Sequence, residues 1–162
     1  MTTQQFLLDL HERTHRTFEG LLKHCRELSE EELHREVDGF GYASVQLQLH
    51  HMIGAEKYWL GVLQGRMDID DDAPDYPTVE SLESYREQVS AATQVYLKGA
   101  SETELDTART MLTWGNKEHV LKPVHVITRT QTHIYQHQGQ VLAMCRLFGK
   151  PCNGLDYPLK AQ

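Results

Sequence analysis

The sequence predicts an all-α protein, a four-helix bundle with short extra helical turns between the long helices. Four long stretches place apolar side chains three and four residues apart, which is the spacing of an amphipathic helix. Short segments that begin with serine, with glutamate three residues later, lie between them. No series of alternating apolar and polar residues predicts a set of strands. Amphipathic helices bury their apolar faces against one another, and four of them form a bundle.

The first expected helix spans about residues 2–28. Its apolar residues recur at helical spacing: Leu7, Leu8, Phe18, Leu22 and Cys25. Residues 29–32, Ser-Glu-Glu-Glu, match a capping box, in which the serine and glutamate side chains each bond to the other residue's backbone amide. They predict a short second helix that ends near Val37, before Gly39 and Gly41 interrupt the chain.

The second long helix is expected over about residues 44–63, with a glycine two positions later as its stop. An acidic connection that contains proline follows, up to Thr78. Its opening at 68–72, Asp-Ile-Asp-Asp-Asp, resembles a calcium loop. However, Ala73 stands where such a loop needs glycine, and Val79 stands where it needs glutamate. We therefore expect a solvated acidic loop.

The third long helix is expected from Thr78 to about Lys98. Its apolar face is predicted to comprise Leu82, Tyr85, Val89, Ala92 and Tyr96. A second capping box at 101–104 predicts a short helical turn, and the turn-forming residues within 111–119 predict a small hairpin or a loop. The last long helix is expected over 123–148, because proline favours its first turn and glycine follows its end.

The 162-residue chain is expected to form a single domain, residues 1–162, because no repeat or linker divides it. A net charge of −7 without a basic stripe argues against nucleic-acid binding. The chain has no apolar run of about 20 residues to cross a membrane, and it opens without a secretory signal. The cysteines do not have the number or spacing of a disulfide framework: Cys25, Cys145 and Cys152. We expect a cytoplasmic protein.

The ten histidines are the unusual feature of the composition. His133 and His137 lie one turn apart on the last expected helix. They share a stripe with Val126, Thr130, Val141, Met144 and Phe148. Two imidazoles at this spacing suit a transition metal. The alternative is a pair of histidines at the edge of the core that hydrogen-bond to neighbouring groups.

The second long helix carries two adjacent histidines that point to different sides. His51 shares its side with Leu47, Ala55, Tyr58, Trp59 and Val62, so we expect it to face the bundle interior. His50 lies with Gly54 and Gly61, so we expect it at the surface or at a subunit contact that allows close helix approach. A third inward histidine would complete a three-histidine site, which leaves coordination positions open as catalytic metal sites do.

The first helix contains a pattern found in metalloproteases, His-Glu-x-x-His at residues 11–15. His11 and His15 share a helix face with apolar residues. The charge of Arg13 inside the motif, and the lack of a preceding sheet, argue against a protease. We expect His11 and His15 to be core histidines, or to support ligands of another site.

Two segments resemble the signatures of the DinB-like (YfiT-like) superfamily. Residues 132–141, Thr-His-Ile-Tyr-Gln-His-Gln-Gly-Gln-Val, and 146–151, Arg-Leu-Phe-Gly-Lys-Pro, resemble its last-helix pattern, His-x-x-x-His-Arg-Gly-Gln with a Leu-Gly-Pro ending. Residues 49–60 resemble its second-helix pattern, in which a histidine stands five residues before a glutamate, and this match also selects His51. In the order of elements the resemblance covers nearly the whole chain.

The resemblance implies a four-helix bundle, commonly a homodimer, in which His51, His133 and His137 bind a divalent transition metal such as Zn²⁺ or Ni²⁺. Members of the superfamily include bacillithiol S-transferases and mycothiol-dependent maleylpyruvate isomerases. We therefore expect a thiol S-transferase or hydrolase that acts on small electrophilic molecules, with a low-molecular-weight thiol as a candidate partner. The alternative is a non-catalytic protein that a metal stabilises or that senses metal. The sequence identifies no general base, and Gln138 replaces an arginine that many relatives have.

Overall fold

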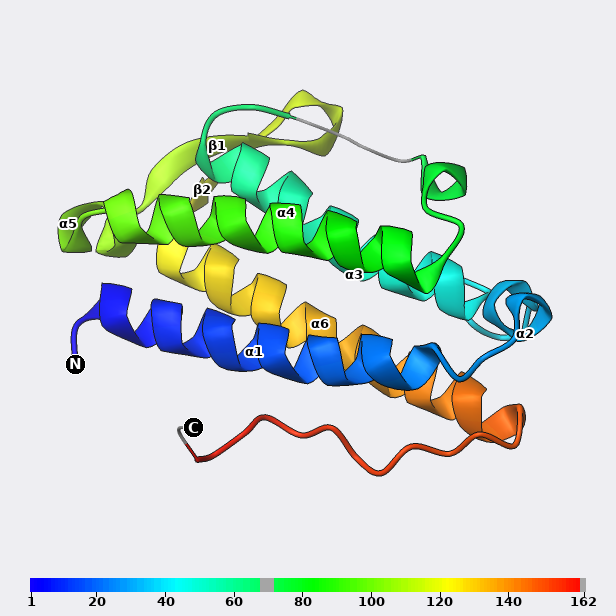
Figure 1. The fold of residues 1–162 in the computed structure, drawn as a ribbon. Helices are drawn as coiled ribbons and strands as arrows, with labels where there is room; N and C mark the ends of the chain where they lie inside the picture. Colours follow the sequence, from blue (N-terminus) through cyan, green and yellow to red (C-terminus); the bar gives the residue numbers. More distant parts are fainter. Residues whose placement is uncertain (68–71, 161–162) are drawn as a thin grey trace.

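The computed structural model describes residues 1–67 and 72–160. Its four long helices are α1 (Thr3–Cys25), α3 (Val45–Leu63), α4 (Val79–Gly99) and α6 (Pro123–Leu147). Around the bundle the packed neighbours are α1 and α4, α4 and α3, α3 and α6, and α6 and α1. Helices α1 and α6 run in one direction and α3 and α4 in the other (Figure 1). The predicted four-helix bundle is confirmed.

The two short helices lie at opposite ends of the bundle (Figure 1). Helix α2 (Glu30–His34) lies at one end, and α5 (Glu102–Asp106) lies at the other. Strands β1 (Arg109–Thr113) and β2 (Lys117–Leu121) pair antiparallel and form a hairpin. Of the two alternatives predicted for this segment, a hairpin or a loop, the hairpin is the one that forms. Its tip is a 3₁₀ turn, Trp114–Asn116, in which Gly115 adopts a φ of 67°. A second 3₁₀ turn, Ala73–Asp75, precedes α4.

The helix ends follow the capping residues in the sequence. Full capping boxes open α1 at Thr2, α2 at Ser29 and α4 at Thr78. The side chains of Ser44 and Ser101 accept hydrogen bonds from backbone amides at the starts of α3 and α5. These bonds satisfy amide groups that the first helical turn leaves without partners. The sequence therefore placed the helix boundaries within a few residues.

The core consists of two apolar clusters with buried polar residues between them. The larger cluster includes residues from α2 and from all four long helices: Phe18, Leu22, Leu33, Leu49, Ile53, Leu82, Ile134 and Met144. The smaller includes residues from α5 and the hairpin: Leu7, Tyr58, Val62, Leu97, Leu105, Met111 and Val126. Buried polar residues lie near the junction on every long helix, and we call them the polar layer: His11, Thr14, His15, Glu56, Arg86, Ser90, Thr93, Thr130 and Gln131.

The polar layer explains why the expected apolar face of α4 is partly wrong. Ala92 is exposed, and Tyr96 is only half-buried. The buried face instead continues through Arg86, Ser90 and Thr93. The hydrophobic pattern counts only apolar residues, so it does not detect polar side chains that face the interior. The helix face predicted from the sequence is therefore rotated relative to the buried face of α4.

The expected surface position of His50 is wrong. Its side chain is only 7% exposed and lies against the rings of Tyr76 and Tyr85, at centroid distances of 5.5 and 5.7 Å. Helix α3 packs against α4 on one side and α6 on the other, so both of its histidines face neighbouring elements. Gly61 is also buried, so the strip of His50, Gly54 and Gly61 is no free surface for a subunit contact. The homodimer stays a prediction.

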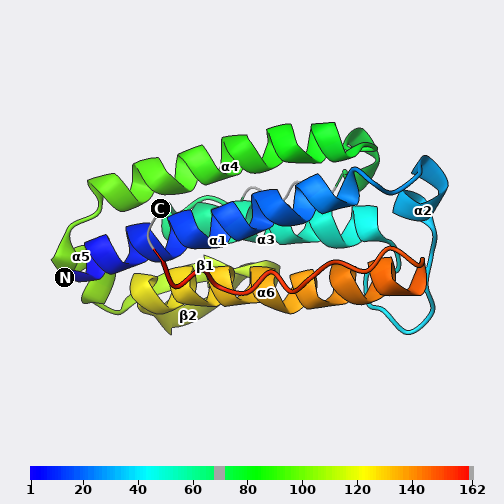
Figure 2. The ribbon, with the colours of Figure 1, turned by 60° about the horizontal axis from the view of Figure 1, so that its bottom comes forward.

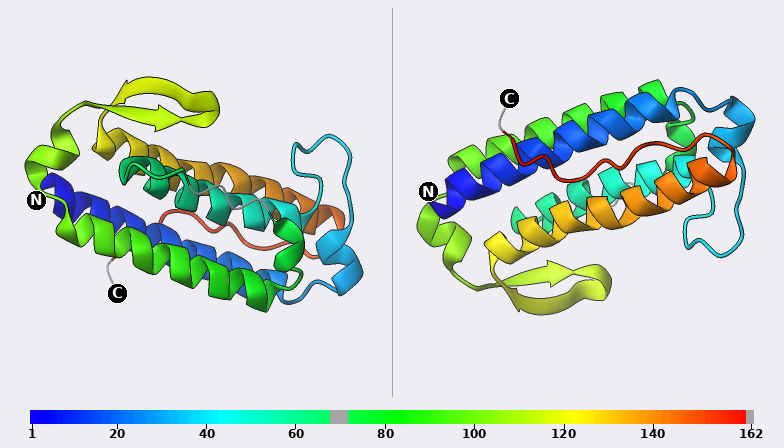
Figure 3. Two further views of the ribbon diagram at one scale, coloured as in Figure 1. Left: turned by 90° about the horizontal axis from the view of Figure 1, so that it is seen from above. Right: turned by 90° about the horizontal axis from the view of Figure 1, so that it is seen from below.

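The C-terminal segment, residues 150–160, runs in extended form along α1 and α6 (Figures 2 and 3). The Arg13 guanidinium donates to the Pro158 carbonyl over 2.8 Å, and the Gln138 amide donates to the Leu155 carbonyl. No described helix is both long and apolar enough to cross a membrane. The expected acidic loop falls largely on residues 68–71, which lie outside the described residues. The three cysteines are free thiols, as expected.

Candidate metal centre

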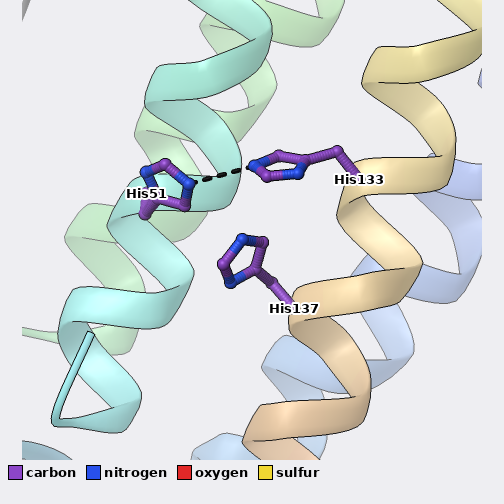
Figure 4. A group of neighbouring side chains, drawn as sticks. All are labelled: His51, His133 and His137. Atoms are coloured by element: carbon purple, nitrogen blue, oxygen red, sulfur yellow. Dashed lines mark hydrogen bonds between the residues drawn. The ribbon is translucent and has the colours of Figure 1, made fainter. Parts of the chain in front are cut away.

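Three histidines converge between α3 and α6 (Figure 4). His133 and His137 project from successive turns of α6 toward His51 on α3. The Nε2 atoms of His51 and His133 are 3.0 Å apart. The ring centroids are 4.4 Å apart for His133 and His137, 4.6 Å for His51 and His137, and 5.1 Å for His51 and His133. The structure thus brings together the three residues that the sequence proposed as ligands.

A hydrogen-bonded chain of glutamines orients the ring of His137. Its Nδ1 lies 2.6 Å from Oε1 of Gln48, and the Gln48 amide nitrogen donates to the Tyr42 carbonyl and to Oε1 of Gln140. An amide oxygen only accepts, so Nδ1 carries the proton and the Nε2 lone pair is free for a metal. The Tyr42 ring also stacks on His51, with centroids 3.9 Å apart and planes 19° apart.

The sequence analysis missed these supporting residues, although a signal for two of them was present. Gln48 precedes His51 by three residues on α3, and Gln140 follows His137 by three on α6. Side chains three residues apart lie on the same helix face, so both glutamines could have been placed beside the histidines. Tyr42 lies in the loop before α3, and its position depends on how that loop folds.

All three imidazoles favour their neutral form. The pKa of His51 is lowered to about 4, mainly by burial and to a smaller extent by the nearby His137 and His133. Burial and His133 lower the pKa of His137 to about 4. The pKa of His133 is lowered by burial and by the positive charge of Arg129. Imidazole binds a metal only when neutral, so these environments favour coordination at neutral pH.

The donor set fits a divalent transition metal. Each histidine offers one ring nitrogen, and the three ligand atoms lie within 4.8 Å of one another. Three imidazoles suit Zn²⁺, Ni²⁺ or Cu²⁺. His51 and His133 are partly exposed, so an outside molecule can reach the group. Among residues 1–67 and 72–160 no carboxylate joins these three histidines as a fourth ligand.

A second group of metal-ligand type lies in the polar layer, between α1 and α3. Nε2 of His11 is 2.9 Å from one carboxylate oxygen of Glu56, and Nε2 of His15 is 2.8 Å from the other. Arg86 donates to Nδ1 of His15 over 3.3 Å, so the proton of this imidazole is on Nε2, facing Glu56. Both contacts are then hydrogen bonds to a carboxylate.

Electrostatics favour the ionised carboxylate of Glu56 in this second group. Burial alone would raise the pKa of Glu56, but the two imidazoles outweigh burial and hold the pKa well below its usual value. Arg86, itself buried, contacts the far ring nitrogen of His15 and forms an ion pair with Glu19 over 3.1 Å. His11 and His15 are buried and both contact Glu56 through Nε2, so in this structure they are hydrogen-bonding residues of the core.

The protease interpretation of the His-Glu-x-x-His motif also lacks its glutamate. Glu12 is exposed and pairs with Arg16 over 3.2 Å on the outer side of α1. A glutamate that faces solvent there cannot act as a base at a site formed by His11 and His15. The carboxylate that meets these histidines comes from α3 instead.

Gln138, which replaces the arginine of many relatives, does not face the three-histidine group. It is buried, and its amide donates to the Leu155 carbonyl in the C-terminal segment, which lies along α1. The side chain at this position therefore holds the C-terminal segment.

Comparison with known proteins agrees with the helical fold. Curated proteins include no significant match to this chain. The family model described as the DinB family matches residues 1–162, the whole chain. On this match the chain belongs to the DinB family.

Proposed function

We propose that the protein binds one divalent transition metal through His51, His133 and His137 and uses it in an enzymatic reaction. The reaction is transfer of a thiol to a small electrophilic molecule, or hydrolysis of such a molecule. The observation that carries the proposal is the convergence of three neutral imidazoles at a place reached by solvent. Zn²⁺ and Ni²⁺ are the metals that we favour, since imidazole nitrogen suits both.

The residues around the histidines support this role. Gln48 keeps the proton of His137 on Nδ1, so that Nε2 points toward the other two rings. The stacked ring of Tyr42 restrains His51. A bound metal would act as a Lewis acid and would lower the pKa of a coordinated water or thiol. The partial exposure of His51 and His133 leaves room for the substrate to approach.

The alternative is a non-catalytic protein that the metal only stabilises, or one that senses the metal supply. Structural zinc sites are usually closed by four protein ligands. Within the described part of the chain only three donors meet here, and two of them are partly exposed. An incomplete and accessible donor set favours catalysis over a structural role.

Metal analysis of single variants tests the binding step. Purified protein is dialysed against Zn²⁺ or Ni²⁺, and bound metal is measured per chain. We expect about one ion in the wild type and strong loss in His51→Ala, His133→Ala and His137→Ala, because two protein ligands bind weakly. His125→Ala is the matched control, since His125 is exposed on the same helix α6 and should leave metal content unchanged.

Activity of the loaded protein tests the catalytic step. A simple thiol with an aromatic chloride probes thiol transfer, and an activated ester probes hydrolysis. Turnover that is abolished in His51→Ala and kept in His125→Ala supports the proposal. Stoichiometric metal with no turnover of either probe, combined with a large rise in thermal stability on metal binding, would favour the structural alternative.

A further inference from the structure

Arg129 stands one helical turn before His133 on α6 and extends the row formed by His133 and His137. Its side chain is exposed, and its guanidinium carbon lies 5.1 Å from the ring centroid of Trp59. Trp59 lies two turns beyond His51 on the antiparallel helix α3. The Arg129–Trp59 contact therefore spans the α3–α6 interface next to the three histidines.

The guanidinium of Arg129 has no acidic partner in the described part of the chain, although the protein has 23 acidic residues against 16 basic ones. Ion pairs hold most of the other arginines: Arg13 with Asp9, Arg16 with Glu12, Arg26 with Glu83, Arg35 with Glu31, Arg86 with Glu19 and Arg109 with Glu104. A guanidinium stacked on an indole keeps its N–H groups available in the plane, where a carboxylate binds through two hydrogen bonds.

A bound divalent metal together with Arg129 would make the surroundings of the three histidines positive in an otherwise acidic protein. The ligand set is neutral, so a divalent metal would keep its full charge there. The charge of Arg129 acts at the same place, since Arg129 lies one helical turn from His133 on the same face of α6. Two cationic centres side by side attract and orient an anionic ligand.

We propose that Arg129 binds the anionic group of the ligand and that this group is a carboxylate. The inference rests on the proposed function and deepens it, because it assigns the ligand class. The carboxylate lies about one helical turn, roughly 6 Å, from the atom that meets the metal. It belongs either to the electrophilic molecule or to the thiol. Trp59 holds the guanidinium in place and forms an apolar wall beside the ligand.

Tryptophan fluorescence gives a binding assay that is independent of turnover. The chain has two tryptophans, so Trp114→Phe leaves Trp59 as the reporter beside Arg129. The zinc-loaded protein is titrated with succinate, with mercaptosuccinate and with 2-mercaptoethanol. Arg129→Gln removes the charge, and Arg129→Lys keeps the charge without the planar fork. Arg146→Gln is the control, because Arg146 is exposed nearly five turns further along α6.

We expect Arg129→Gln to weaken carboxylate binding by about tenfold or more, the usual loss for a charge-assisted hydrogen bond. The carboxylate affinity of Arg129→Lys should lie between those of the parent and Arg129→Gln, and the affinity of Arg146→Gln should equal that of the parent. If the electrophile carries the carboxylate, succinate binds in an Arg129-dependent way. If the thiol carries it, mercaptosuccinate binds more tightly than 2-mercaptoethanol by a margin that Arg129→Gln removes, while succinate binds weakly.

Zinc content, measured in every sample, separates the two proposals. Equal affinity of the parent and Arg129→Gln for both carboxylates, with about one zinc per chain in each, would overturn the role of Arg129 alone. Failure of the parent protein to bind zinc would overturn the proposed function, and this inference with it.

Discussion

Replacing Glu56 by glutamine should destabilise the fold strongly while leaving the three-histidine group intact. The carboxylate is 2% exposed and accepts from His11 and His15. Glutamine keeps the volume but replaces the charged acceptor by a neutral amide. Its nitrogen meets an acceptor only after His11 moves its proton to Nδ1, an atom without a partner among the described residues. A hydrogen bond to a charged group contributes about 1.5–3 kcal/mol, so we expect a loss of about 1.5–3 kcal/mol in the free energy of unfolding.

Urea unfolding measures this loss as a lower midpoint at an unchanged slope. Glu12→Gln is the matched control, because Glu12 is an exposed glutamate whose ion pair with Arg16 should contribute less than about 1 kcal/mol. The folded pKa of Glu56 is lowered, so its contribution is complete above the unfolded value of about 4.3 and is lost as pH falls through the folded pKa. Equal losses in the two variants would refute the buried network.

The remaining predictions concern the metal centre and assembly. Gln48→Ala should weaken zinc binding by about 10- to 100-fold, and Gln48→Glu should largely restore it, as competition with a chelator would show. Because the pKa values of His51 and His137 are lowered to about 4, zinc release on acidification should have its midpoint well below the ordinary histidine value of about 6.5. A release midpoint at or above that value would contradict those environments. The protein should sediment as a homodimer at micromolar concentration, and a monomeric mass would refute this prediction.

Local sequence signals predicted most of the fold. Capping residues and glycine stops placed the helix ends because they act through backbone bonds within one turn. His133 and His137 could be paired for the same reason, since i, i+4 residues meet on any α-helix. The choice of His51 over His50 as the ligand was also made from the sequence, and the structure places His51 beside the α6 pair.

The errors arose where burial depends on distant elements. His50 is covered by Tyr76 and Tyr85, and no pattern on α3 alone reveals them. Glu56 meets histidines more than 40 residues earlier in the chain, so its buried role could not be read from its neighbours. The buried face of α4 was partly mispredicted because it contains residues of the polar layer, which a hydrophobic pattern assigns to the surface.

The metal content of two variants tests the central claim most directly. The account predicts that His133→Ala loses zinc at neutral pH, while the double variant His11→Ala/His15→Ala, although less stable, keeps about one zinc per chain. Each protein is measured after the same dialysis, with circular dichroism to show that it is folded. Loss of zinc from the folded double variant, together with retention in His133→Ala, would contradict the account and move the metal to the His-Glu-x-x-His histidines of α1.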